Sequence, residues 1–264
     1  MSYVLTYPFK ILLRYLFKKK HLEYLLRKSD FFSIPIYIIS FNRLEYIRQT
    51  LEWLEAYGYT NITIIDNKSD YQPLLEFYKT CGHKVIYMNK NYGHFVFYKA
   101  PRFFLSRLFS FFILTDPDLA PIEDCPRDFV EQFVKTMVYY PKYQKVGFSL
   151  KIDDLAEIHR VEINWEKRFW ESSAVLDFPE STYKIYHAAC DTTFALNSPA
   201  IYTPNLRTAG NSIRLGVPYQ VRHLPWYVTS LNDEELNYIN SARKDISNWS
   251  AYIRERISKG AIHD

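Results

Sequence analysis

From Ile34 to Asp118 the chain alternates apolar runs with amphipathic helical segments, and this alternation restricts the possible folds more than any other feature. Short apolar runs that end in polar turns are typical of buried strands. Strand, helix, strand and helix in regular succession predict a mostly parallel central sheet, flanked by helices and wound with right-handed crossovers. We therefore expect an α/β fold in a single Rossmann-like domain. The expected strands are IPIYIISFN, NITIIDNKS, KVIYMNKNYG and FFILTDPD, and the expected helices are 44–58, 73–80 and 94–106, followed in the second half of the chain by one at 123–140.

Polar residues follow each of these expected strands. The carboxyl ends of parallel strands meet at one edge of a sheet, and open α/β sheets bind their ligands at that edge. These residues are therefore the first candidates for a binding site. They are Ser40, Asn42 and Arg43 after the first strand, Asp66, Asn67 and Ser69 after the second, Asn91 and Gly93 after the third, and Asp116 and Asp118 after the fourth.

The fourth strand runs directly into two carboxylates, Asp116 and Asp118, which are separated by Pro117. Proline has a fixed φ and no N–H donor, so the chain turns here and both acids can approach one cation. Carboxylate oxygens suit Mg²⁺ or Mn²⁺, although an acidic turn without a metal is the alternative. The chain has neither a Gly-rich dinucleotide fingerprint nor a Gly-rich phosphate loop. A bound diphosphate would therefore depend on a metal, and Mn²⁺ or Mg²⁺ is the expected cofactor.

Positive charge is concentrated near the N-terminus. Seven basic and two acidic residues fall within positions 1–33, so this segment carries +5 and the remainder −1. A nucleic-acid partner is not expected, because such proteins spread positive charge over a folded face. Lys10, Arg14 and Lys18 share one face of a predicted basic amphipathic helix among apolar residues. Two interpretations stay open: the helix lies on an anionic membrane surface, or it docks on the domain.

Localisation is predicted from two further features. No apolar run approaches the roughly 18 uncharged residues of a spanning helix. The three cysteines, none at metal-ligand spacing, favour a reducing compartment. We expect a cytoplasmic protein that is peripheral on the inner face of the membrane.

Four motifs in order, IPIYIISFNRLEYIRQTLEWL, IIDNKSDYQPLLEFY, NYG and LTDPDLAP, resemble the nucleotide-sugar half of GT-A fold glycosyltransferases, closest to the inverting family 2 enzymes. The resemblance covers about residues 33–125. It implies that Ser40, Asn42 and Arg43 contact the nucleotide base, and that Asp66, with Asn67 and Ser69 beside it, binds the base or ribose. Asn91 and Gly93 are expected to complete the nucleotide site. Asp116 and Asp118 would hold the divalent ion against the diphosphate.

The second half of the chain contains candidates for acceptor binding and catalysis. Asp191 lies within a predicted strand, 186–196, where family 2 enzymes carry a polar residue facing the sugar; it is a candidate base or sugar ligand. These enzymes usually place an acidic pair near the position of His223, and this departure leaves the base undecided. His223 is a metal ligand, the base or a strand histidine. Further acceptor or diphosphate candidates are Trp165, Trp170, Arg214, Arg222, Trp226 and Tyr227.

The chain is accordingly divided into an N-terminal helical segment, a catalytic domain and a C-terminal helical segment. The expected function is metal-dependent transfer of a hexose, with inversion, from a UDP-sugar to a glycan or lipid-linked acceptor in surface polysaccharide synthesis. The alternatives are a sugar nucleotidyltransferase and a non-catalytic glycan-binding protein. The expected boundaries are 1–32, 33–230 (33–125 for the nucleotide-sugar half and 126–230 for the acceptor half) and 231–264.

Overall fold

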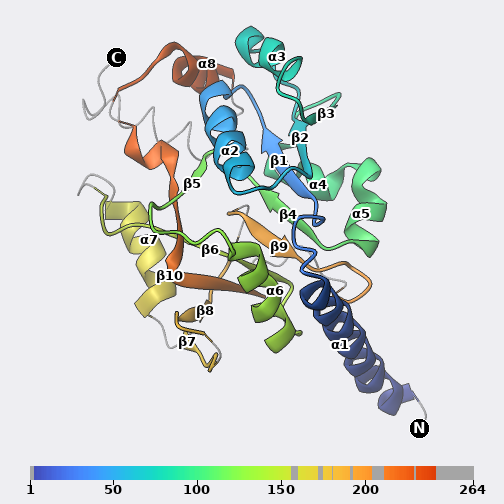
Figure 1. Cartoon of the computed structure of the whole chain (residues 1–264). Coiled ribbons are helices and arrows are strands. Elements are labelled where there is room, and N and C mark those ends of the chain that lie inside the picture. The colour runs from blue at the N-terminus through green and yellow to red at the C-terminus, as the bar shows by residue number, and fades with distance from the viewer. Residues whose placement is uncertain are drawn as a thin grey trace.

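The computed structural model in Figure 1 shows an α/β protein in which helices flank one central sheet. The structure describes residues 3–155, 160–171, 175–179, 181–190, 193–203, 211–228 and 230–241. Its helices are α1 (Tyr3–Lys28), α2 (Leu44–Ala56), α3 (Gln72–Tyr78), α4 (Val96–Lys99), α5 (Phe104–Phe109), α6 (Phe129–Tyr139), α7 (Arg160–Glu171) and α8 (Asp233–Ser241).

Within the described residues the sheet has ten strands, in the order β3-β2-β1-β4-β9-β6-β10-β8-β7, with β5 paired to β10. Seven strands run in one direction, and β5, β8 and β9 run in the other. The predicted mostly parallel sheet is therefore confirmed. The strands are β1 (Ile36–Ser40), β2 (Ile62–Asp66), β3 (Lys84–Tyr87), β4 (Phe112–Thr115), β5 (Leu119–Pro121), β6 (Lys145–Leu150), β7 (Val175–Leu176), β8 (Ile185–His187), β9 (Ala195–Asn197) and β10 (Ser212–His223).

Two apolar cores cover the two faces of the sheet, because successive strand residues point to opposite sides. On β1, Ile36 and Ile38 join the larger core, which also contains buried residues of α1, α2, α3 and α6. Ile39 joins the smaller core with residues of α4 and the segment before α5. The near-continuous apolar composition of β1, β2 and β4 follows from this double burial.

Three expected elements differ from the structure. The helix expected at 94–106 is divided into short helices, because Pro101 cannot continue the helix that precedes it. The helix expected at 123–140 begins only at Phe129, after Pro126. The strand expected at 186–196 is wrong: β8 pairs with β10, while β9 lies between β4 and β6. Local apolar composition does not reveal that the chain changes its place in the sheet there.

The N-terminal helix α1 docks on the domain along its C-terminal half. Leu22 and Leu25 are buried in the larger core. Lys18 is also fully buried, and its ammonium donates to the carbonyl of Tyr143. Lys18, predicted to share one basic helical face with Lys10 and Arg14, therefore faces the domain, where Tyr143 offers it a buried acceptor. Figure 1 shows the N-terminal half of α1 extending away from the sheet. No helix in the described part of the chain is both long and apolar enough to span a bilayer.

Lys18 makes stability depend on pH. Burial lowers the pKa of Lys18 to about 7, whereas a lysine in an unfolded chain has a pKa of about 10.4. Between these two pKa values the unfolded chain binds more protons than the folded chain. Lys18 therefore destabilises the folded state fully below its folded pKa, and this destabilisation disappears as the pH rises toward the pKa of the unfolded chain. We expect Lys18→Met to raise Tm relative to the wild type more at about pH 6 than at about pH 10.

Differential scanning calorimetry across this pH range measures the effect. The exposed neighbour variant Lys19→Met provides the control, because it should change Tm equally at both pH values. A Tm difference for Lys18→Met that is independent of pH would contradict the assignment.

Candidate active site

The order of the strands defines where a ligand site is expected. β2 and β3 lie on one side of β1, and β4 lies on the other. The direction of winding therefore reverses between β1 and β4, and open α/β sheets bind ligands beyond the carboxyl ends of the strands at such a point. The segments that leave these two ends contain Asn42 and Arg43, and Asp116 and Asp118. The prediction that polar strand ends lie together at one edge of the sheet is confirmed for β1 and β4.

The backbone of the acidic turn is held by α2 and by the end of β10. Thr50 Oγ1 donates to the Pro117 carbonyl at 2.5 Å, and Trp53 Nε1 donates to the Leu119 carbonyl at 3.1 Å. Leu224 N donates to the Asp118 carbonyl at 2.9 Å. These contacts fix the turn from two sides, so the direction of its carboxylates is set by the fold.

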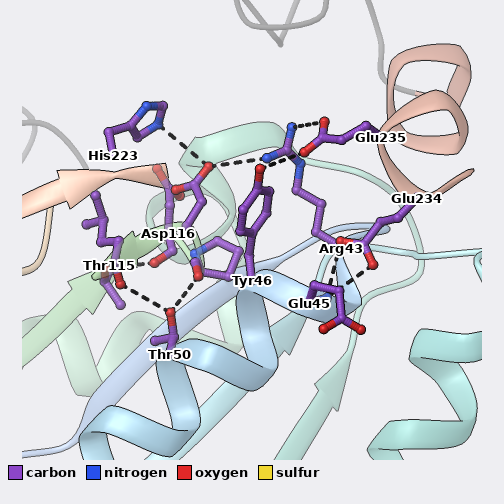
Figure 2. Close-up of polar contacts among 12 residues, drawn as sticks. Arg43, Glu45, Tyr46, Thr50, Thr115, Asp116, His223, Glu234 and Glu235 are labelled. Carbon is purple, nitrogen blue, oxygen red and sulfur yellow. Dashed lines mark hydrogen bonds and ion pairs between the residues drawn. The ribbon is translucent and has the colours of Figure 1, made fainter. Parts of the chain in front are cut away.

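Asp118 lies between His223 and Arg43, both of which are labelled in Figure 2. Its Oδ2 is 3.6 Å from His223 Nε2 and 3.7 Å from Arg43 Nη1. Its Oδ1 is buried and has no hydrogen-bond partner within the described residues. Buried carboxylate oxygens without partners are rare in folded proteins, because a donor, a water or an ion satisfies nearly all of them. One oxygen of Asp118 is therefore available to a ligand.

Arg43 connects Asp118 to the C-terminal helix. Its Nη2 is 3.1 Å from Glu235 Oε2, and its guanidinium lies over the rings of Tyr238 at 3.9 Å and Tyr46 at 4.8 Å. Tyr46 Oη donates to the other oxygen of Glu235 at 2.7 Å. Burial alone would lower the pKa of Arg43, but the surrounding carboxylates, Glu235 foremost, raise it above its ordinary value. Arg43 is a permanent cation that orients Asp118.

His223 ends β10 with its ring against Trp226, at a centroid distance of 4.9 Å. About a quarter of its side chain is exposed (26%). Burial lowers the pKa of His223, and this outweighs the attraction of Asp118, which alone would raise it. A lowered pKa favours the neutral imidazole, the form that accepts a proton or binds a metal.

The residues expected to contact the nucleotide base form hydrogen bonds or ion pairs with other residues of the protein. Ser40 Oγ accepts from Tyr78 Oη at 2.9 Å. Asn42, in the left-handed region at φ 50°, accepts from the backbone N–H groups of Asp70 at 2.8 Å and Tyr71 at 3.1 Å. Its Nδ2 donates to Asp70 Oδ1 at 2.6 Å and to Ser241 Oγ at 2.8 Å. Their contacts with a nucleotide stay predictions, and in this structure they fix the loop.

The ends of β2 and β3 are joined by Asn67. Its Nδ2 donates to Asn91 Oδ1 at 2.9 Å and to the Gly93 carbonyl at 3.0 Å. Asp66 Oδ2 accepts from Ser69 N at 3.2 Å, while the buried Oδ1 has no hydrogen-bond partner in the described part of the chain. Burial raises the pKa of Asp66, opposed by the hydrogen bonds with Ser69. Asp66 and Asp118 thus each keep one oxygen without a hydrogen bond.

Two arginine candidates of the second half pair with acids of other segments. Arg214 is buried, and its Nη1 lies 2.6 Å from Glu166 Oε2 on α7. Arg222 pairs with Glu123 at 2.9 Å and with Asp154 at 3.1 Å. Because each guanidinium already has a carboxylate partner, a role in binding a diphosphate stays a prediction for both.

The aromatic candidates are placed as follows. Tyr227 Oη donates to Asp154 Oδ1 at 2.6 Å, and Trp226 contacts His223. Trp165 is exposed on α7, where the guanidinium of Arg168 covers its ring at 3.7 Å. The side chain of Trp170 and the whole of Asp191 lie outside the residues that the structure describes.

The assignment of Asp116, Asp118 and His223 to a metal site stays a prediction. Two carboxylates and a neutral imidazole suit a divalent cation, and Asp118 Oδ1 lacks a partner among the described residues. However, no three His, Cys, Asp or Glu side chains in the described ranges converge to hold a metal ion. A metal bound here would require Asp116, Asp118 and His223 to move toward one another.

Sequence reasoning missed the two glutamates at the start of α8. Glu234 accepts from Glu45 N with both carboxylate oxygens, at 3.2 Å and 3.1 Å, and so satisfies a free N–H of the first turn of α2. Glu235 pairs with Arg43. The available signal is the run NDEEL, in which acids precede a helix whose apolar residues must pack on the domain.

Neither a model of a known protein family nor any curated protein matches this chain. Among solved structures, the mannosyltransferase PcManGT from Pyrobaculum calidifontis, in complex with GDP-Man and Mn²⁺, is similar at 12% identity and a TM-score of 0.33. The similarity covers 46% of this chain and 36% of that one. A putative glucose-1-phosphate thymidylyltransferase from Bacillus anthracis, in complex with a sucrose, is 12% identical with a TM-score of 0.33, over 88% and 86% of the two chains.

The ion pair between Arg43 and Glu235 should contribute strongly to stability, because its loss leaves a buried cation with a weaker partner. We expect Glu235→Gln to lower the free energy of unfolding by about 3 kcal/mol. The variant Asp233→Asn, at an exposed residue of the same helical turn, should lower it by less than about 1 kcal/mol. Urea denaturation measures both values, and equal losses would show that the charge of Glu235 does not hold Arg43.

Proposed function

We propose that this chain is a metal-dependent glycosyltransferase that takes its sugar from a nucleotide-diphosphate donor, with UDP as the expected nucleotide. The observation that carries the proposal is Asp118, whose buried Oδ1 lacks a hydrogen bond within the described residues and which lies between His223 and Arg43 at the switch point of the sheet. A donor with an anionic diphosphate suits this site, because the carboxylates and the imidazole of His223 could bind a metal ion and Arg43 adds a permanent positive charge. The acceptor is the hydroxyl of a glycan or a lipid-linked sugar.

The two carboxylate oxygens of Asp66 and Asp118 that lack hydrogen bonds support a donor that spans the edge of the sheet. Asp66 ends β2, and Asp118 follows β4, with β1 between these strands. The ends of β2 and β4 are therefore two strand spacings apart, about 10 Å. A nucleoside diphosphate is long enough to reach both, with its ribose or base at Asp66 and its diphosphate at Asp118.

In the proposed reaction, the two acids of the turn and the residues proposed to act with them each have a role. Bound Mn²⁺ or Mg²⁺ supplies Lewis-acid stabilisation of the negative charge that forms on the leaving diphosphate. Asp116 and Asp118 would hold the ion, with His223 as a third ligand, and Arg43 orients Asp118. The acceptor hydroxyl attacks the anomeric carbon, the bond from this carbon to the diphosphate oxygen breaks, and Asp191 takes the hydroxyl proton. Attack opposite the leaving group inverts the anomeric carbon.

The charge of Asp118 should be required for metal-dependent nucleotide binding. Asp118→Asn keeps the size of the side chain and removes its charge, so UDP affinity in the presence of Mn²⁺ should fall at least about tenfold, equal to about 1.4 kcal/mol. Isothermal titration calorimetry with Mn²⁺ or with EDTA measures the affinity, and circular dichroism verifies the fold. The exposed variant Asp124→Asn is the control and should bind UDP as the wild type does. Unchanged Mn²⁺-dependent affinity in Asp118→Asn would refute the metal assignment.

Asp191 and His223 should differ in which step they affect. A base acts only in the transition state, so Asp191→Asn should keep UDP affinity and lose most of kcat, with kcat/KM falling equally. Loss of a metal ligand should weaken binding first, so His223→Ala should lower Mn²⁺-dependent UDP affinity, and excess Mn²⁺ should restore part of the activity. Steady-state kinetics and calorimetry on both variants measure these effects. Exchanged results would make His223 the base, and two fully active variants would remove both residues from the site.

A donor screen tests the reaction itself. Activated sugars are supplied with and without Mn²⁺, and release of free UDP, GDP or dTDP is measured. Release of a nucleoside diphosphate only when acceptor and metal are present supports glycosyl transfer. Release of pyrophosphate from a nucleoside triphosphate and a sugar phosphate would instead identify a nucleotidyltransferase.

A further inference from the structure

Large apolar side chains are exposed on two segments of the described chain. Exposed aromatic and aliphatic residues of this kind are uncommon in contiguous groups on proteins without a partner for them. Half of those in the described residues belong to α1 or to the stretch 95–109. They are Leu12, Leu16, Phe17 and Tyr24 on α1, and Phe95, Phe104, Leu105 and Phe109 on the second segment.

Helix α5 has an apolar sequence, FLSRLF, yet none of its residues is buried. Leu105 is 66% exposed, the largest fraction among the apolar side chains of these two segments. An apolar helix gains stability in water by burying its apolar face, so α5 lacks the contact that its sequence favours. Figure 1 places α5 at the outside of the molecule, on the same side as α1.

α1 and α5 are connected through a small cluster of side chains. His21 on α1 packs edge-on against Phe111 at 5.0 Å, and its Nδ1 lies 3.3 Å from Tyr202 Oη. Ile201, beside Tyr202, donates its N–H to the carbonyl of Leu108 in α5 at 3.2 Å. Ile201 is itself exposed, so it continues the apolar surface between the two helices.

Two exposed aromatic residues of α1 lie next to His21, the residue that contacts Phe111 and Tyr202. At about 100° per residue, Phe17 and Tyr24 lie about 40° and 60° from His21 around the helix axis. The buried residues Lys18 and Leu22 lie on the opposite side of His21. The exposed aromatic face of α1 is therefore adjacent to the seam that joins α1 to α5.

Charge identifies the partner for this surface. Residues 89–112 contain Lys90, Lys99, Arg102 and Arg107 but no Asp or Glu, and Glu23 is the one acid of residues 3–28. A second copy of the chain placed on this surface would bring like charges together at short range. Apolar side chains interspersed with Lys and Arg suit an anionic lipid surface, which accepts the first and attracts the second.

We propose that α1 and α5 together form a composite surface that docks on an anionic lipid bilayer. The exposed apolar residues of both helices enter the headgroup region, and exposed basic residues around them, such as Lys99 and Arg102, bind the anionic headgroups. The inference concerns where the protein binds, and it does not depend on the reaction assigned to the acidic turn. It differs from docking by α1 alone, because it requires α5.

Vesicle co-sedimentation of the full chain tests the proposal, with phosphatidylcholine alone or mixed with phosphatidylserine. We expect binding to the mixed vesicles only, and weaker binding at high salt because screening reduces the attraction of exposed charges. The double variant Leu105→Ser, Phe109→Ser leaves α1 intact and should lower the partition coefficient at least tenfold. Tyr87→Ser replaces an exposed apolar residue on β3, outside both helices, and should bind as the wild type does.

Three outcomes would overturn the composite surface. Unchanged binding of the α5 double variant would mean that α1 suffices, and equal loss in Tyr87→Ser would mean that the effect is not local. Binding to phosphatidylcholine alone with the same affinity would exclude the role of charge. Thermal unfolding of each variant verifies that exposed-site changes leave the fold intact, and vesicle binding is measured without any sugar donor.

Discussion

The buried guanidinium of Arg43 is the interaction on which the candidate site depends. It joins the start of α2 to the acidic turn through Asp118 and to α8 through Glu235, although 192 residues separate Arg43 and Glu235 in the sequence. A buried charge that loses its partner is strongly unfavourable, so these three segments are stabilised as one unit. Helix α8 is therefore part of the body of the site, and its Glu234 also supplies the acceptor for the first turn of α2.

The polar residues at the strand ends divide into two groups. Asn42 and Asn67 use their side-chain amides to fix neighbouring loops, and their hydrogen bonds are satisfied within the protein. Asp66 and Asp118 each keep a buried oxygen without a hydrogen bond among the described residues. Since buried polar groups are almost always paired, these two oxygens are the positions where a ligand is most strongly indicated. The loops form a scaffold, and the two carboxylates face the proposed donor.

The sequence predicted the first half of the sheet well, because β1, β2, β3 and β4 are local apolar runs with clear turns. The prediction failed where contacts between residues far apart in the sequence determine the structure. The stretch 186–196 divides between two places in the sheet, and Lys18 is buried because Tyr143, 125 residues away, offers a carbonyl. Glu235 resembled an ordinary helix residue, since no local pattern indicates a pairing with Arg43. The acidic turn itself was predictable in position, whereas its ion pairs with Arg43 and His223 required the fold.

We propose that Asp118 holds a divalent cation against the diphosphate of the donor. Anomalous diffraction at the manganese edge, from crystals grown with Mn²⁺ and UDP, tests it most directly. We expect a peak within about 2.5 Å of a carboxylate oxygen of Asp118, with the diphosphate oxygens on its other side. UDP bound at the carboxyl ends of β1 and β4 with no manganese peak at Asp118, or a peak at other residues, would contradict it.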